Sequence, residues 1–169
     1  NDQKRALMQQ LLTGKRRVRG FSIPFERYHI SEIAEIDRKS LSNKTPGNFE
    51  FEYISLSDVA TQTISETLER HTFDAAPSRA RRCVKEGDIL MSTVRPNLQA
   101  FAVVGERHSK CIASTGFAVL SVRPRFDPDY LFHYLFGAHI TGQLNALVVG
   151  SNYPAINSSD VSALNVYAP

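Results

Sequence analysis

Three apolar segments in the second half of the chain place the tightest limits on how it can fold. They lie at residues 89–94, 100–104 and 116–122, are rich in β-branched side chains, and are bounded by glycine, proline and asparagine. Short apolar runs with such boundaries are typical of strands that are buried on both faces. We therefore expect the three segments to be central strands of one sheet, with a turn at Glu86, Gly87 and Asp88 before the first.

Weaker signals predict further strands. Apolar and polar residues alternate at residues 29–36 and again at 49–56, and a short apolar run at 163–167 suits a final strand. Residues 57–77 show no clear pattern, and we assign them no structure.

Two helices are indicated by their end signals. Asp127 is a capping residue, Pro128 suits the first helical position, and an apolar stripe follows, so a helix begins there, with a break expected near Gly142. A shorter helix at the start of the chain is expected to end in a left-handed cap at Gly14. Residues 150–154 favour a turn.

The length and composition are those of one ordinary globular domain. The chain has 169 residues, 42% of them hydrophobic and 22% charged. No apolar run approaches the roughly 20 residues that cross a bilayer, and we expect the two cysteines, Cys83 and Cys111, to be reduced thiols in or near the core of a cytoplasmic protein. The predicted fold class is α+β: a strand-rich single domain with helices toward its C-terminal end and a short N-terminal helix.

Residues suited to catalysis do not occur at catalytic spacings. No two of the five histidines are four residues apart, neither cysteine has a CxxC partner, and the nine glycines form neither a GxGxxG nor a P-loop motif. Asp127 and Asp129 are better explained as first-turn acids that complement the helix dipole than as metal ligands. We therefore expect no catalysis, metal or cofactor in this chain; a nuclease or methyltransferase fragment is the least favoured alternative.

Basic residues, in contrast, gather beside amide and hydroxyl side chains. The three groups are Arg79, Arg81, Arg82 and Lys85, then Arg95 and Asn97, then Lys39, Asn43 and Lys44. Lysine and arginine neutralise phosphates, and arginine, asparagine and glutamine bond to base edges, so this mixture suits double-stranded DNA. A solvated charged face explains any one group equally well. The first two groups flank the strand at 89–94, whose ends lie about 20 Å apart if it is extended at roughly 3.3 Å per residue.

Five segments, taken in order, resemble one protein family. They are QKRALMQQLLTGKRRVRGF at 3–21, YISLSDV at 53–59, APSRARRCVKEGDILMSTVRPN at 76–97, CIASTGFAVL at 111–120 and GSNYPAINSSDVSALNVYAP at 150–169. Their succession resembles the specificity (S) subunits of type I restriction-modification enzymes. Residues 1–19 look like the end of the central conserved helix, and residues 20–169 look like the second target-recognition domain. We expect the final residues to lead toward a second conserved helix, absent from this chain.

The resemblance implies a division of labour between subunits. In the family, two recognition domains each read one half of a split DNA target, and two long conserved helices hold them a fixed distance apart. Methylation belongs to the modification subunits, which use S-adenosylmethionine, and cleavage belongs to the restriction subunit, which uses ATP and Mg²⁺. The implied partners of this chain are double-stranded DNA, the modification subunits and, through them, the restriction subunit; no membrane is implied.

We expect loops on one face of the sheet to enter the DNA grooves. The first candidates for phosphate or guanine contacts are Arg79, Arg81, Arg82 and Arg95. The second candidates are Lys39, Asn43, Lys44, Asn97, Ser151, Asn152 and Tyr153. Alternatives stay open for three of them: Tyr153 equally suits a packed turn aromatic, and one of Arg81 and Arg82 can instead pair with an acidic neighbour.

An apolar stripe on the first helix suggests a second role. Its members, expected to dock a partner helix, are Leu7, Met8, Leu11 and Leu12. The alternative function is therefore a protein-interaction module that docks partner helices without reading DNA. Salt-dependent binding to duplex DNA separates the two hypotheses.

Overall fold

The computed structural model describes residues 2–148 and 153–169. The strands within these ranges form two four-stranded sheets and two separate strand pairs. The first sheet is antiparallel with the order β2 (Ala34–Ile36), β11 (Phe117–Val122), β8 (Ile89–Ser92) and β9 (Phe101–Val103). The second has the order β6 (Glu69–Thr72), β3 (Glu50–Ile54), β10 (Ile112–Ser114) and β7 (Ala80–Cys83), in which only β3 and β10 run parallel. The pairs are β1 (Glu26–His29) with β12 (Asn165–Ala168), and β4 (Val59–Ala60) with β5 (Thr63–Ile64). The fold is α+β, as predicted.

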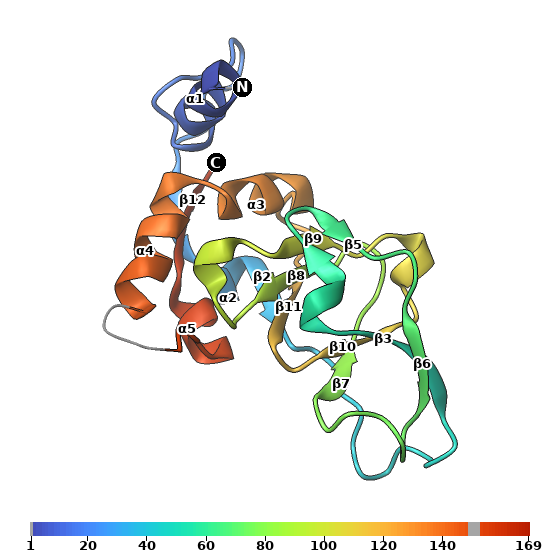
Figure 1. Cartoon of the computed structure of the whole chain (residues 1–169). Helices are drawn as coiled ribbons and strands as arrows, with labels where there is room; N and C mark the ends of the chain where they lie inside the picture. The colour runs from blue at the N-terminus through green and yellow to red at the C-terminus, as the bar shows by residue number, and fades with distance from the viewer. Residues whose placement is uncertain (1, 149–152) are drawn as a thin grey trace.

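The three predicted strands are neighbours in the first sheet, but only β8 and β11 are central as expected; β9 lies at its edge and pairs with β8 alone. Along β8, Ile89 and Met91 lie in a core shared with the helices, whereas Leu90 between them lies in a core shared with the second sheet. Successive strand residues point to opposite faces, so the first sheet is the middle layer. Figure 1 shows this arrangement, with the helices on the left, the first sheet in the middle and the second sheet on the right.

The turn expected before β8 is also present. Gly87 has φ +82°, which a side chain disfavours. The buried carboxylate of Asp88 accepts a hydrogen bond from the Lys85 amide (2.9 Å) and another from the Ser121 hydroxyl on β11 (2.7 Å). The turn is therefore tied to the centre of the sheet.

The helices lie mainly near the C-terminal end of the chain. They are α1 (Asp2–Leu12), α2 (Ile30–Ile33), α3 (Pro128–Leu135), α4 (Ala138–Val148) and α5 (Ser158–Ala163), with 3₁₀ turns η1 (Leu56–Asp58), η2 (Pro96–Leu98) and η3 (Glu106–His108). As predicted, Asp127 caps α3 and accepts a hydrogen bond from the Tyr130 amide (2.8 Å). None of the helices in the described ranges is long and apolar enough to cross a membrane.

The predicted break near Gly142 is wrong. The chain instead turns at Phe136 and Gly137, and α4 continues through Gly142, which is exposed and meets nothing nearby. The Phe136 ring packs against Phe101 and Phe132, with ring centroids 5.7 and 5.2 Å apart. The packing of Phe136 against the sheet therefore sets the position of the break between α3 and α4.

The single strand predicted at residues 29–36 is wrong in its middle. The helical turn α2 separates β1 from β2, and its first and last residues, Ile30 and Ile33, are both buried in the core with the helices. Glu32 reaches back to accept a hydrogen bond from the His29 amide (2.6 Å), the contact that begins a helix. Three-residue spacing puts both isoleucines on one face, which the alternating pattern concealed.

Side chains from η3 hold the segment that showed no clear pattern, residues 57–77. Arg107 makes two hydrogen bonds of 2.8 Å to the Glu52 carboxylate on β3, and a third to the Glu66 carbonyl (3.2 Å). The His108 ring lies 2.9 Å from the Ser65 carbonyl. Because these contacts join residues 41 to 55 positions apart, no local pattern could show them.

The first helix ends as expected and is tied to the domain. Gly14 follows α1 with φ +72°. The Tyr130 hydroxyl lies 2.9 Å from the Leu12 carbonyl and 2.6 Å from the Tyr167 carbonyl on β12, and burial raises the pKa of this hydroxyl. Figure 1 shows α1 at one end of the molecule, close to the C-terminus. The division at residue 19 stays a prediction.

One carboxylate joins the two sheets to α5. Asp37, at the end of β2, accepts a hydrogen bond from the Val119 amide on β11 (3.0 Å) and another from the Ser158 hydroxyl at the start of α5 (2.5 Å). It also forms an ion pair with Arg82 on β7 (2.9 Å). Its backbone is left-handed, with φ +53°, a conformation that aspartate tolerates better than most residues.

We expect Asp37→Asn to lower the free energy of unfolding by about 1–3 kcal/mol, because the amide keeps the shape and the backbone preference but carries no charge and cannot form the ion pair with Arg82. Urea denaturation measures the change. Glu35→Gln, on the exposed face of the same strand, is the matched control and should change little. An Asp37→Asn protein as stable as the control would show that the ion pair does not hold the sheets together.

A second prediction concerns the Arg107–Glu52 pair. Hydrogen bonds from Arg107 lower the pKa of Glu52 from its ordinary value of 4.5. A carboxyl group with a lowered pKa stabilises the fold above its unfolded pKa, and this contribution is lost as the pH falls through the folded pKa. The pair should therefore stabilise the fold at neutral pH and lose its effect below about pH 4.5. In Arg107→Met, an NMR titration should find that the pKa of Glu52 has risen to near its ordinary value. A pKa that stays as low as in the unaltered protein would show that Arg107 does not cause the lowering.

Candidate nucleic-acid interface

Two of the three basic groups predicted from the sequence come together along one strand, except for Lys85, which lies in the turn before β8. Residues 39–41 run beside β7: the Cys83 amide donates to the Lys39 carbonyl (3.0 Å), and the Leu41 amide donates to the Arg81 carbonyl (2.7 Å). A turn follows, closed by a hydrogen bond from the Thr45 amide to the Ser42 carbonyl (2.8 Å). We call this surface the β7 edge; its members are Lys39, Asn43, Lys44, Arg79, Arg81 and Arg82.

The three arginines of the β7 edge have different surroundings. Arg81 lies over the Phe73 ring, 4.6 Å from its centroid, and donates to the Ala80 carbonyl (2.8 Å). Arg82 is held by Asp37, and only 22% of its side chain is exposed. Of Arg81 and Arg82, it is therefore Arg82 that pairs with an acidic residue, one of the two alternatives left open by the sequence.

Arg79 is the arginine best placed for an external anion. It is exposed, and its backbone is anchored because its carbonyl accepts a hydrogen bond from the Thr115 amide (2.8 Å). Within the described part of the chain, no hydrogen bond or ion pair engages its side chain. Lys39, Asn43 and Lys44 are exposed as well. The β7 edge thus presents cations from two segments about 40 residues apart.

The remaining basic group lies elsewhere. Arg95 and Asn97 are exposed at η2, beyond the end of β8. The Arg95 amide donates to the Pro154 carbonyl (2.7 Å), and η2 packs against α4 through a hydrogen bond from the Gln99 amide group to the Thr141 hydroxyl (3.1 Å). Figure 1 shows α4 and β7 at opposite sides of the molecule. Arg95 and Asn97 therefore form a second surface that does not join the β7 edge.

Three further candidates lie in the segment before α5. Ser151 and Asn152 fall outside the described residues. Tyr153 is exposed, with 58% of its surface accessible. It precedes Pro154, which the Arg95 amide contacts, so it lies near the second surface rather than the β7 edge.

The apolar stripe of α1 is divided between two pockets. Met8 and Leu12 line a pocket of about 870 Å³ between α1 and the domain, and Leu12 also packs on the core. Leu11 lines a second pocket of about 420 Å³ together with the exposed Phe21 and Ile23. Leu7 is 42% exposed. The four residues therefore do not form one continuous outward face.

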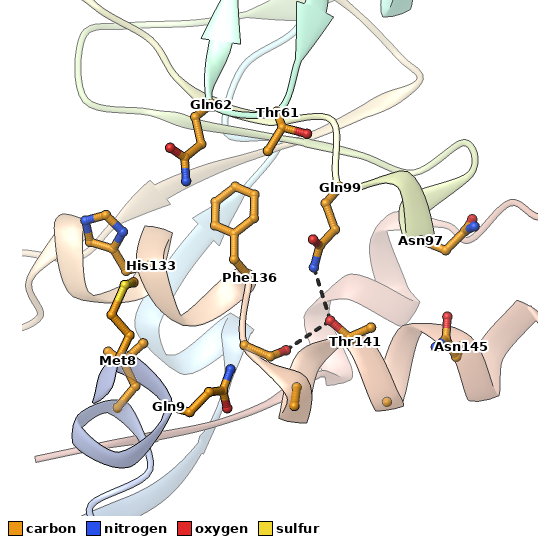
Figure 2. A pocket seen from close by; sticks show the side chains of 14 residues that line it. Met8, Gln9, Thr61, Gln62, Asn97, Gln99, His133, Phe136, Thr141 and Asn145 are labelled. Carbon is orange, nitrogen blue, oxygen red and sulfur yellow. Dashed lines mark hydrogen bonds between the residues drawn. The ribbon is translucent and has the colours of Figure 1, made fainter. Parts of the chain in front are cut away.

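The larger pocket gathers amide and hydroxyl side chains that the sequence did not single out, apart from Asn97 (Figure 2). Its polar members are Gln9, Thr61, Gln62, Asn97, Gln99, His133, Thr141 and Asn145. They come from α1, the turn between β4 and β5, η2, and the helices α3 and α4. Isolated glutamines in loops carry no local sequence signal, so only the fold could bring them together.

Groups that support catalysis are sparse in the described ranges. There, no cluster of three or more histidine, cysteine, aspartate or glutamate side chains is placed to hold a metal. Burial raises the pKa of both Cys83 and Cys111, so both thiols stay protonated at neutral pH. Cys111 is buried and Cys83 half-buried, as the sequence suggested.

Comparison with known proteins shows a clear structural likeness. The chain matches a chain from a type I restriction-modification system, solved to explain complex assembly and conformational transition, with a TM-score of 0.78 and 28% identity. It matches the HsdS subunit from Thermoanaerobacter tengcongensis with a TM-score of 0.73 and 26% identity. These matches cover 88% and 89% of this chain.

A third match shows the fold alone: the S subunit of a type I system from M. genitalium has a TM-score of 0.54 and 12% identity, over 90% of this chain. The chain spans only 36% to 40% of the length of these three structures. No protein-family profile and no curated protein sequence matches it. The structure confirms the resemblance seen in the sequence motifs: this chain has the α+β fold of a target-recognition domain in the specificity subunits of type I restriction-modification systems.

Proposed function

We propose that this chain reads one half of a two-part DNA target as part of a specificity subunit, in the cytoplasm, and so directs methylation and cleavage by partner subunits. The observation that carries the proposal is the likeness to type I specificity subunits over nearly the whole chain, at 26% and 28% identity. The division of labour follows from that resemblance: modification subunits supply S-adenosylmethionine chemistry, and the restriction subunit uses ATP and Mg²⁺.

The β7 edge supports DNA contact at this surface. Lys39, Lys44 and Arg79 are exposed cations on neighbouring backbone segments, as phosphate binding requires. Arg82 instead stabilises the fold through Asp37. Phosphate contacts orient a protein on the duplex but carry no sequence information, so the β7 edge would position the domain and other residues would read the bases.

The alternative of a helix-docking module is favoured by a separate observation. Apolar side chains beyond α1 are unusually exposed for a soluble domain: Val18 by 55%, Phe21 by 68% and Ile23 by 65%. This surface suits a protein partner such as a modification subunit. Docking there does not exclude DNA reading, because the β7 edge lies at the other end of the molecule (Figure 1).

The test measures binding of the full chain to duplex DNA over a range of salt concentrations. We expect Lys44→Gln with Arg79→Gln to weaken binding to all sequences alike and to reduce the slope of log affinity against log salt by about 2 units, since each lost phosphate contact removes about 0.9.

The matched control removes the same charge at Arg27 and Lys110, which are exposed and lie outside the β7 edge. If the control weakened DNA binding as much as the test variant does, the loss would come from net charge and not from contacts at the β7 edge. Absence of salt-dependent binding by the unaltered chain would favour the docking alternative, and metal-dependent cleavage by it would support a nuclease.

A further inference from the structure

Two exposed tips are held side by side at the mouth of the larger pocket. One is the turn between β4 and β5, which contains Thr61 and Gln62, and the other is η2, followed by Gln99. Both are bonded to Phe101 on β9: the Gln62 amide donates to the Phe101 carbonyl (2.8 Å), and the Phe101 amide donates to the Gln99 carbonyl (2.8 Å). Phe101 is fully buried. The tips therefore share one rigid attachment.

Three residues at these tips hold a backbone conformation that side chains disfavour. Gln62, Arg95 and Gln99 have φ values of +67°, +48° and +53°. Glycine adopts this region without penalty, and asparagine and aspartate do so more readily than glutamine or arginine. Elsewhere in the described residues, the only non-glycine residue with positive φ is Asp37, whose carboxylate joins the two sheets. Side chains kept at a strained position often serve a function.

The side chains at the tips carry hydrogen-bonding groups and line the same pocket. Figure 2 shows Gln62 and Gln99 on either side of the Phe136 ring, with Asn97 at the rim beyond them. Within the described part of the chain, the amide groups of Gln62 and Asn97 make no hydrogen bond. Gln99 donates to the Thr141 hydroxyl (3.1 Å), which lies 3.1 Å from the Gly137 carbonyl, so its amide is oriented in advance.

The chemistry of this pocket differs from that of the β7 edge. No lysine, arginine, aspartate or glutamate lines the pocket among the described residues, so it is poorly suited to phosphates. Carboxamides instead donate and accept together, which matches N6 and N7 of adenine in the major groove. Leu98, between Asn97 and Gln99, is 62% exposed and is suited to contact the thymine methyl group of the same base pair.

We propose that Gln62, Asn97 and Gln99 are specificity-determining residues that read A·T base pairs in the major groove, while the cations of the β7 edge contact phosphates. The inference rests on the proposed DNA-reading function and deepens it. It assigns base reading to uncharged side chains outside the arginine run and places the two kinds of contact on separate surfaces.

The test selects bound duplexes from a randomised pool at low salt, using the full chain. The variants are Gln62→Gly, Gln99→Gly and Asn97→Ala, singly and together, with Gln10→Ala, an exposed glutamine of α1 outside the pocket, as the control. The glycine variants remove the side chain and relieve the positive φ, and in Gln99→Gly this relief offsets the lost hydrogen bond to Thr141, so a folding defect is not expected from them. Melting temperature and the salt slope are measured for each.

We expect each variant to reduce the preference for A·T at one or two positions by about 5- to 150-fold, the range for losing one two-pronged base contact. The salt slope and melting temperature should match those of the control. Unchanged preferences in all variants would overturn the inference and leave the proposed function standing.

Three other outcomes are equally decisive. A lower melting temperature in the glycine variants, with preferences kept in whatever remains folded, would make the glutamines structural and overturn the inference. No sequence preference in the unaltered chain would overturn the proposed function itself. If the variants kept their DNA preference and lost binding to a modification subunit, the pocket would be a protein-docking site instead.

Discussion

The fold depends above all on the carboxylate of Asp37. It ties the end of β2 to β11, reaches α5 through Ser158, and crosses to the second sheet through Arg82. A charge with so little exposure is costly to bury alone, so its three partners must all be present together. The residue also adopts a left-handed backbone, which the surrounding contacts hold in place. Together with the pairing of β7 to β10, this junction positions β7 and the cations along it.

Because of this junction, the arginines at residues 79–82 have different roles in the fold. From the sequence, Arg79, Arg81 and Arg82 look alike, but in the fold they do three different things: Arg79 is exposed, Arg81 covers the Phe73 ring, and Arg82 completes the ion pair. Strand alternation explains part of this difference, since neighbours on β7 point to opposite faces. Removing Arg82 would therefore report on stability, and removing Arg79 on binding.

The two candidate surfaces suit different parts of a DNA molecule. The β7 edge carries exposed cations, which neutralise phosphates regardless of sequence, whereas the pocket beside η2 carries neutral amides. Base reading needs fixed geometry because a two-pronged contact tolerates little displacement, while a phosphate contact by a flexible lysine tolerates much. Anchoring both tips on the buried Phe101 meets that need.

The sequence by itself determined the features that depend on near neighbours. The buried strands β8, β9 and β11, the capped start of α3 and the turn at Gly87 follow from residue type and spacing, and the order of the motifs pointed to the specificity-subunit fold. Only the tertiary structure decided which cations share a surface, which arginine is sequestered, and that loop glutamines 37 residues apart lie side by side. These outcomes rest on hydrogen bonds and packing between segments that are distant in the sequence. Local periodicity cannot encode a contact whose partner lies elsewhere in the chain, and for the same reason it did not reveal the helical turn α2 within an apparent strand.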